Sequence, residues 1–225
     1  MPRDEPALWC EDVTYDYPTR GETVHALSGV ALTVPRGAIT AVVGPSGSGK
    51  STLLKILACL ERPENGRVWI DGTEVTALSA RARRAVRRTR VGYVFQDPAD
   101  NLLDYLTVAE HLALAARLRG RDTSAELVGV LGLGHRTGHV PWRLSGGEQQ
   151  RVALAFAAAG EPAVVIADEP TAQLDRDSAG RVVEALRLLA DRGQAILLAT
   201  HDPEVSRVAD RVVELVDGRL GEVSC

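Results

Sequence analysis

Residues 39–52 read Ile39-Thr40-Ala41-Val42-Val43-Gly44-Pro45-Ser46-Gly47-Ser48-Gly49-Lys50-Ser51-Thr52, and this stretch decides the fold class. Its first five residues are mostly apolar, as expected for a short strand buried on both faces of a parallel sheet. The next eight, residues 44–51, fit the pattern G-x-x-x-x-G-K-[ST], a phosphate-binding loop between a strand and a helix. A helical pattern does follow, so we predict an α/β chain that binds a phosphate-containing ligand here.

The residue types of this loop suit the chemistry of a bound triphosphate. Glycines let the backbone wrap phosphate groups closely. Lys50 would reach the β- and γ-phosphates and support catalysis, and the hydroxyl of Ser51 would ligate Mg²⁺. The simpler alternative is a glycine-rich turn, which the flanking strand disfavours. The residues that we expect to contact the nucleotide are Gly44, Pro45, Ser46, Gly47, Ser48, Gly49, Lys50, Ser51 and Thr52.

A pair of carboxylates follows a second buried-strand pattern. Residues 163–167 are apolar, and Asp168 and Glu169 come directly after them. Ligands collect at the carboxyl ends of parallel strands. We expect Asp168 to hold Mg²⁺, directly or through water, and Glu169 to orient and deprotonate the attacking water. An Asp-Glu pair after a strand is often only a solvated strand end, and the phosphate loop is what favours the catalytic interpretation.

Composition limits the class of protein. The 225 residues suffice for one α/β domain or for one with an inserted subdomain, and the net charge of −4 gives no sign of general nucleic-acid binding. Three cysteines without C-x-x-C spacing support neither a zinc site nor a disulfide framework and agree with a reducing cytoplasm. No apolar run approaches the ~20 residues needed to span a bilayer, so a partner would have to hold the protein at a membrane.

The order of strand and helix patterns predicts the organisation of the domain. Strands that alternate with helices indicate a parallel core sheet, whereas residues 97–150 have helical segments and no convincing strand. We therefore expect a helical subdomain inserted there. Residues 79–90 hold six arginines. A solvated helix face is the simpler interpretation of them, and contact with a membrane surface or a partner is the alternative.

A second anion-binding motif lies about a hundred residues after the first. It reads Leu144-Ser145-Gly146-Gly147-Glu148-Gln149-Gln150-Arg151 and opens an apolar helical pattern. Two glycines leave free backbone N–H groups at the start of a helix, where an anion is favoured. Ser145 and Glu148 also have the spacing of a capping box. The two roles of Ser145, capping the helix and binding an anion, could alternate with the nucleotide state.

With these motifs in this order, the chain resembles the ATP-binding subunit of ABC transporters over nearly its whole length, from about residue 8 to 221. Tyr17 lies where that family stacks an aromatic ring on adenine, and Tyr15 is the less favoured candidate. The other matching motifs are the signature at Leu144-Ser145-Gly146-Gly147-Glu148, the Q-loop residue Gln96, the D-loop Thr171-Ala172-Gln173-Leu174-Asp175 and the switch histidine His201.

The resemblance implies one ABC ATP-binding domain over residues 1–225. Its P-loop NTPase core, of the RecA-like type, would have a mainly parallel sheet, an N-terminal antiparallel β region and the α-helical insertion at about 97–150. Two such domains would sandwich two ATP molecules, each between the phosphate loop of one domain and the signature of the other. The implied partners are a second copy or another ABC ATPase domain and a transmembrane permease at the inner face of the membrane, with no nucleic acid.

The resemblance also implies individual roles. Gln96 would touch Mg²⁺ and the water, and His201 would contact the γ-phosphate. Asp175 would act across the dimer interface. Taken singly, Gln96 could be an ordinary strand-end amide and His201 an ordinary turn histidine, but their order among the other motifs favours the functional roles. The signature residues implied to face the nucleotide of the other subunit are Ser145, Gly146, Gly147 and Glu148.

Several phrases resemble the macrolide-exporter and lipoprotein-release group, among them residues 24–27, 60–66 and 106–110. Two departures stand out: Asp104 occupies the usual place of a proline, and residues 155–157 lack an arginine that the group commonly has. We predict an ATPase that drives a permease, an exporter of this type. The alternative is an ABC ATPase that regulates a membrane partner without moving cargo. A cassette working on DNA or ribosomes is disfavoured because those usually carry paired cassettes or long insertions.

Overall fold

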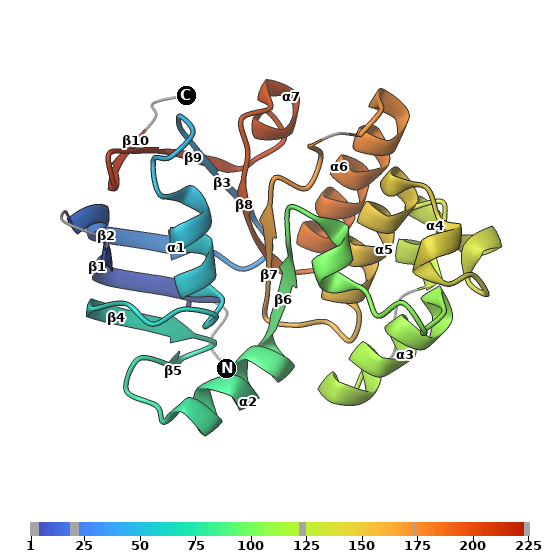
Figure 1. The fold of residues 1–225 in the computed structure, drawn as a ribbon, viewed down its shortest axis with the longest axis horizontal. Coiled ribbons are helices and arrows are strands. Elements are labelled where there is room, and N and C mark those ends of the chain that lie inside the picture. The colour runs from blue at the N-terminus through green and yellow to red at the C-terminus, as the bar shows by residue number, and fades with distance from the viewer. Residues whose placement is uncertain (1–4, 19–22, 122–124, 173, 223–225) are drawn as a thin grey trace.

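The computed structural model describes residues 5–18, 23–121, 125–172 and 174–222, and two sheets form its framework (Figure 1). Within these ranges, an antiparallel sheet has the strand order β2-β1-β4-β5, and a larger sheet has the order β10-β9-β3-β8-β7-β6. The strands are β1 (Leu8–Pro18), β2 (Thr23–Val34), β3 (Ile39–Val43), β4 (Asn65–Ile70), β5 (Thr73–Glu74), β6 (Val91–Val94), β7 (Val164–Asp168), β8 (Ala195–Ala199), β9 (Arg211–Val216) and β10 (Arg219–Glu222).

Helices connect the strands and cover the larger sheet. Short 3-10 turns lie at Pro98–Asn101, Gly134–Arg136 and Pro141–Arg143. The α-helices are α1 (Lys50–Leu57), α2 (Ala80–Arg90), α3 (Val108–Arg119), α4 (Ala125–Val130), α5 (Gly146–Ala158), α6 (Arg176–Asp191) and α7 (Pro203–Ser206). The predicted α/β architecture with a mainly parallel sheet and an N-terminal antiparallel region is confirmed.

The parallel strands separate two hydrophobic cores. β3 pairs with β8 and β9, β8 with β7, and β7 with β6, all in parallel, whereas β10 runs antiparallel to β9. Ala41 and Val165 face the core shared with α5 and α6, whereas Val42 and Ile166 face the core shared with α1 and the antiparallel sheet. Helix α1 therefore lies between the two sheets (Figure 1). Because both faces are covered, β3 is mostly apolar, as predicted, and β8 is apolar along its whole length.

The helical region shares its core with the sheet. Leu112 of α3, Leu127 of α4 and Leu154 of α5 belong to the same buried cluster as Ile196 of β8. Helix α5 runs without a break from Gly146 to Ala158, so the expected end of the insertion near residue 150 falls inside a helix. The division of the chain into core and insertion stays a prediction.

Candidate active site

The phosphate loop runs from the end of β3 into α1, and two other strands back it closely. Gly44 has a φ of 145°, and a Cβ added there would lie 2.1 Å from the backbone oxygen of Leu215 in β9. Gly49 has a φ of 102°, and its Cβ would lie 2.4 Å from the backbone oxygen of Ala26 in β2. Only glycine fits at either position because any side chain would clash. The path of the loop is thus fixed by β2 and β9.

Lys50 points back into the curve of this loop. Its Nζ donates hydrogen bonds to the carbonyl oxygens of Gly44, at 2.8 Å, and Pro45, at 2.9 Å. An ammonium group has three N–H donors, so one remains beyond these two bonds. The loop therefore holds a positive charge and a free donor at its centre, which suits phosphate oxygens.

A cavity of about 730 Å³ opens above the loop, a size that suits a small-molecule ligand. Tyr17 lines it, with its hydroxyl 3.2 Å from Oγ1 of Thr52. Tyr15 instead packs against the hydrophobic core, so Tyr17 is the better placed to stack on a base. Ser48 does not line the cavity, because its side chain is buried. The other predicted residues in the lining are Gly44, Pro45, Ser46, Gly47, Gly49, Lys50, Ser51, Thr52, Gln96, Glu169 and His201.

The three predicted metal ligands, Ser51, Gln96 and Asp168, line an adjoining cavity of about 430 Å³. Its other charged lining residues are Lys55, Asp97 and Asp100. Asp168 ends β7, and burial raises the pKa of its carboxyl group, while a hydrogen bond from Ser51 lowers it in part. Hydroxyl, amide and carboxylate oxygens are ligands that Mg²⁺ prefers, and a cation would offset the cost of burying this carboxylate. The described residues contain no group of three or more His, Cys, Asp or Glu placed to hold a metal ion. Phosphate oxygens would therefore have to complete the coordination.

Glu169 and His201 form a pair on the cavity wall. Nδ1 of His201 lies 2.9 Å from Oε2 of Glu169, and this contact raises the pKa of the imidazole. Glu169 has a φ of 49°, a left-handed conformation that is uncommon outside glycine, and its N–H donates to the carbonyl oxygen of Ala199. Strained backbone of this kind is often found at functional sites. The carboxylate is therefore held at the end of β7, where it can accept a proton from water.

The signature residues lie elsewhere, at the start of α5. Ser145 and Glu148 form the predicted capping box: Oε2 of Glu148 accepts hydrogen bonds from the backbone N–H of Ser145 at 2.8 Å and from its Oγ at 3.0 Å. Nε of Arg136 donates to Oε1 of Glu148 at 2.7 Å. These hydrogen bonds, the backbone one above all, lower the pKa of Glu148 to about 2. Glu148 is thus ionised at neutral pH, and its hydrogen bonds hold the first turn of α5 in place.

Asp175 belongs to the same neighbourhood as the signature. It caps α6 by accepting hydrogen bonds from the backbone N–H and the Oγ of Ser178. Ser178 Oγ in turn accepts a 2.6 Å bond from Arg151 of α5, and a Cβ on Gly147 would lie 3.2 Å from that oxygen. The signature and Asp175 thus form a second group. No residue of this group lines the cavity above the phosphate loop.

Comparison with known proteins identifies the family. Residues 27–172 match the family described as ABC transporter. The lipoprotein-releasing system ATP-binding protein LolD 1 of Rhodopirellula baltica is 43% identical over 220 residues, which cover 95% of both chains. The chain belongs to the ABC transporter family. It therefore carries an ATPase domain of the ABC type, and the predicted ATP-binding function is confirmed.

A second relative and a solved structure are also similar to this ABC domain. The macrolide export ATP-binding/permease protein MacB of Hyphomonas neptunium is 42% identical over 221 residues, which are 96% of this chain and 34% of that protein. The chain thus spans about a third of the length of this MacB. The dimeric structure of the ATP-binding cassette MJ0796 with ADP and Pi superposes with a TM-score of 0.86 at 33% identity, covering 97% of this chain and 99% of that one.

Some cavity residues of the ABC domain were missed by sequence reasoning. Val24, His25 and Ala26 of β2 line the cavity, and Nδ1 of His25 lies 2.8 Å from Oδ1 of Asp16. Residues 24–27 had been noted only as a feature of the subfamily, because nothing in their spacing indicates contact with the phosphate loop. In the D-loop, Gln173 lies outside the described residues. The helices in the described part of the chain are all too short or too polar to cross a membrane.

Proposed function

We propose that this chain is the ATP-hydrolysing subunit of a transporter and closes with a second ABC ATPase domain, either another copy or a different chain, around two ATP molecules. The observation that carries the proposal is the separation of its two anion-binding motifs. The phosphate loop lines the cavity, whereas Ser145 and Gly147 lie in a separate group with Asp175. A signature supplied by a second domain would complete each site. The dimeric ADP-bound neighbour supports this arrangement.

The chemistry would proceed at the wall formed by Glu169 and His201. Water attacks the γ-phosphorus while the bond to the bridging oxygen of ADP breaks, and Glu169 accepts a proton from the water. The products are ADP and inorganic phosphate. His201, hydrogen-bonded to Glu169, would orient the carboxylate and contact the γ-phosphate. Lys50 would stabilise the negative charge that builds on the phosphate oxygens.

Ser51, Gln96 and Asp168 would hold the magnesium ion. When bound, Mg²⁺ would neutralise the charge of the β- and γ-phosphates. The three side chains approach from α1, from the end of β6 and from the end of β7, so they would order these elements around the nucleotide. Gln96 would also link the site to the helical region that follows it in the chain.

A transmembrane permease of the macrolide-exporter or lipoprotein-release type would be the partner that holds the chain at the inner face of the membrane. The similarity to LolD 1 and to MacB supports this choice, and neither relative supports the regulatory alternative. A cavity of about 680 Å³ beside α2 offers a docking groove. Tyr93 and Phe95 contribute aromatic surface to it, and Gln96 follows directly in the chain. The groove also carries arginines of α2, namely Arg81, Arg84, Arg87 and Arg88.

The decisive test is the Glu169→Gln variant, which keeps the shape of the side chain and removes the base. We expect ATP to bind, phosphate release to fall by about 100-fold or more, and a dimer to accumulate in light scattering with ATP. The matched double variant, with Ser145→Arg added, should still bind ATP and remain monomeric. Wild-type turnover in Glu169→Gln would refute the assigned base. Loss of ATP binding by the monomer in Ser145→Arg would refute the shared site.

A further inference from the structure

We propose that the chain has a second anion site, for a phosphate anion with two or more negative charges, at the edge of the parallel sheet opposite the phosphate loop. A cavity of about 370 Å³ opens where the parallel strands begin. Arg36 precedes β3, Arg90 precedes β6, Ala163 precedes β7 and Gln194 precedes β8, and all four line it. The phosphate loop follows the carboxyl end of β3, so the two cavities are separated by the length of the strands.

Arginines dominate the lining of this cavity, which we call the arginine cavity. Within the described part of the chain, two carboxylates belong to the same lining, and one of the arginines, Arg192, is paired with Glu126, which is not part of the lining. Five arginines against these three carboxylates leave an excess of two positive charges. The whole chain has a net charge of −4, so composition does not explain this local excess. The charged residues of the lining are Arg36, Arg90, Arg119, Arg121, Arg192, Asp71 and Glu161.

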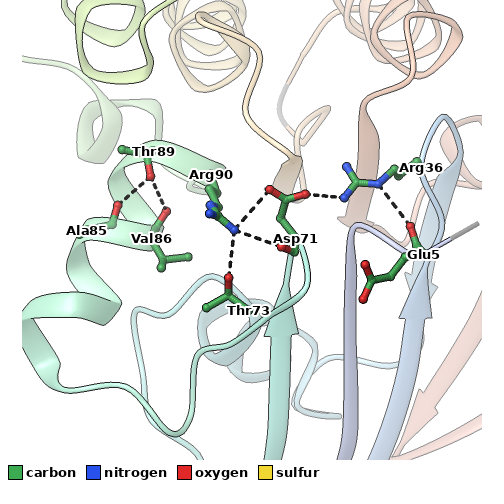
Figure 2. Close-up of polar contacts among 8 residues, drawn as sticks. All are labelled: Glu5, Arg36, Asp71, Thr73, Ala85, Val86, Thr89 and Arg90. Atoms are coloured by element: carbon green, nitrogen blue, oxygen red, sulfur yellow. Dashed lines mark hydrogen bonds and ion pairs between the residues drawn. The ribbon is translucent and has the colours of Figure 1, made fainter. Parts of the chain in front are cut away.

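One carboxylate serves two of these guanidinium groups. In Figure 2, Asp71 lies between Arg36 and Arg90, 2.5 Å from Nη2 of Arg36 and 3.3 Å from Nη1 of Arg90. Nη1 of Arg90 also donates to the backbone oxygen of Asp71 and to Oγ1 of Thr73. A guanidinium has five N–H donors on three nitrogens, and Arg90 makes these contacts through one nitrogen. Because the single negative charge of Asp71 faces the two positive charges of Arg36 and Arg90, one positive charge remains in excess.

Arg119 supplies the second excess charge. Its half-buried guanidinium donates through Nη1 to the carbonyl oxygens of Ala157, at 2.9 Å, and Ala159, and through Nη2 to that of Val91, at 3.0 Å. These acceptors are formally neutral, and the C-terminal end of α5 offsets only about half a charge. Burial accordingly lowers the pKa of Arg119 to about 10. Because Nη1 and Nη2 donate to these backbone carbonyls, whereas the buried Nε has no hydrogen-bond partner among the described residues, Arg119 contributes positive potential to the cavity more than direct contacts.

The chemistry of the lining selects the ligand class. The planar fork of an arginine matches the oxygens of a phosphate group and can bind it through two hydrogen bonds. Arg36, Arg90 and Arg121 are the partly exposed arginines that can turn toward such a ligand. A dianion would balance the excess of two charges. The volume is that of a small-molecule site, so pyrophosphate is a suitable probe.

The test is calorimetric titration of pyrophosphate into the full chain with Lys50→Ala, which disables the phosphate loop. We expect one pyrophosphate per chain, with an affinity that falls as salt is raised. Adding Arg121→Gln, at an exposed side chain whose loss should not unfold the protein, should weaken binding about tenfold. Arg90→Gln should weaken it similarly. The matched control is Arg88→Gln. Arg88 is an exposed residue of α2, the helix that also carries Arg90, and it lines the groove beside α2 instead of the arginine cavity. Its replacement should change the affinity less than about twofold.

Three results would overturn the proposal. Absence of binding to the Lys50→Ala chain would mean that the arginine cavity holds no anion. Equal weakening by Arg88→Gln and Arg121→Gln would mean that pyrophosphate responds only to total charge. Equal affinity for succinate, a dianion without phosphate groups, would mean that the cavity does not distinguish phosphate from other dianions. Thermal unfolding of each variant shows that the folded protein is being titrated.

Discussion

The start of α5 offers a quantitative test of how the signature is held. We predict that Glu148→Gln lowers the free energy of unfolding at neutral pH. Glu148 accepts hydrogen bonds from Ser145 through Oε2 and from Arg136 through Oε1. Glutamine has nearly the same shape and keeps one acceptor oxygen. It cannot form the ion pair with Arg136, and its cap to Ser145 lacks charge assistance.

The pKa of Glu148 sets the magnitude of this loss. The folded-state value is lowered from 4.5 to about 2, and at 1.36 kcal/mol per unit this corresponds to about 3 kcal/mol between the charged and neutral carboxyl group. The side chain is only 12% exposed, so solvent screening is limited. Since glutamine resembles the neutral carboxyl group, we expect a loss of about 2–3 kcal/mol.

The pH dependence gives the sign of the effect. A carboxyl group whose pKa is lowered by folding stabilises the protein fully above its unfolded value of 4.5, and this stabilisation is lost as the pH falls toward about 2. The difference between wild type and Glu148→Gln should therefore shrink on acidification. Urea unfolding followed by circular dichroism, at about pH 7 and about pH 3, measures it.

Helix α3 provides the matched control. Thr107 and Glu110 form the same capping box there, and Glu110 accepts from the backbone N–H of Thr107 at 2.7 Å. Glu110 is exposed and has no arginine partner among the described ion pairs, so Glu110→Gln should cost less than Glu148→Gln. Equal losses in the two variants, or a loss at Glu148 that does not change with pH, would refute the reasoning.

Two further predictions concern packing and proton affinity. Gly92→Ala should destabilise the chain by about 3 kcal/mol or more in thermal unfolding, because its Cβ would lie 2.1 Å from the backbone oxygen of Ala157. Gly134→Ala, where nothing lies within 4 Å, should have little effect, and equal effects would show that the contact is not the cause. An NMR titration should find the pKa of His201 above 6.5 in the wild type and closer to 6.5 in Glu169→Gln, and an unchanged value would argue against their pairing.

Local patterns in the sequence predicted much of the fold. β3 was predicted with its observed bounds because a strand covered on both faces is mostly apolar, and this property needs no knowledge of the partner strands. β9 was missed. Residues 213–216 alternate between buried and exposed, and β9 joins the parallel strands by pairing with β3, more than 160 positions earlier in the chain.

The candidate site was predictable to the extent that its motifs are contiguous. The phosphate loop and the Asp168–Glu169 pair are recognisable because their chemistry requires particular residue types at adjacent positions. The inward burial of Ser48 and the approach of β2 to Gly49 could not be predicted, because they depend on how the loop packs. The individual site assignments stay predictions that the variants above would test.

The sequence by itself thus determined the family, the ATPase chemistry and the order of the main elements, because periodicity and contiguous motifs are local properties. The tertiary structure alone decided that Ser48 is buried and does not line the cavity, and that the signature lies with Asp175 apart from the phosphate loop. It also brought Arg36, Asp71 and Arg90 together. Such contacts join residues far apart in the chain, so they follow from the packing of whole elements and leave no trace in local spacing.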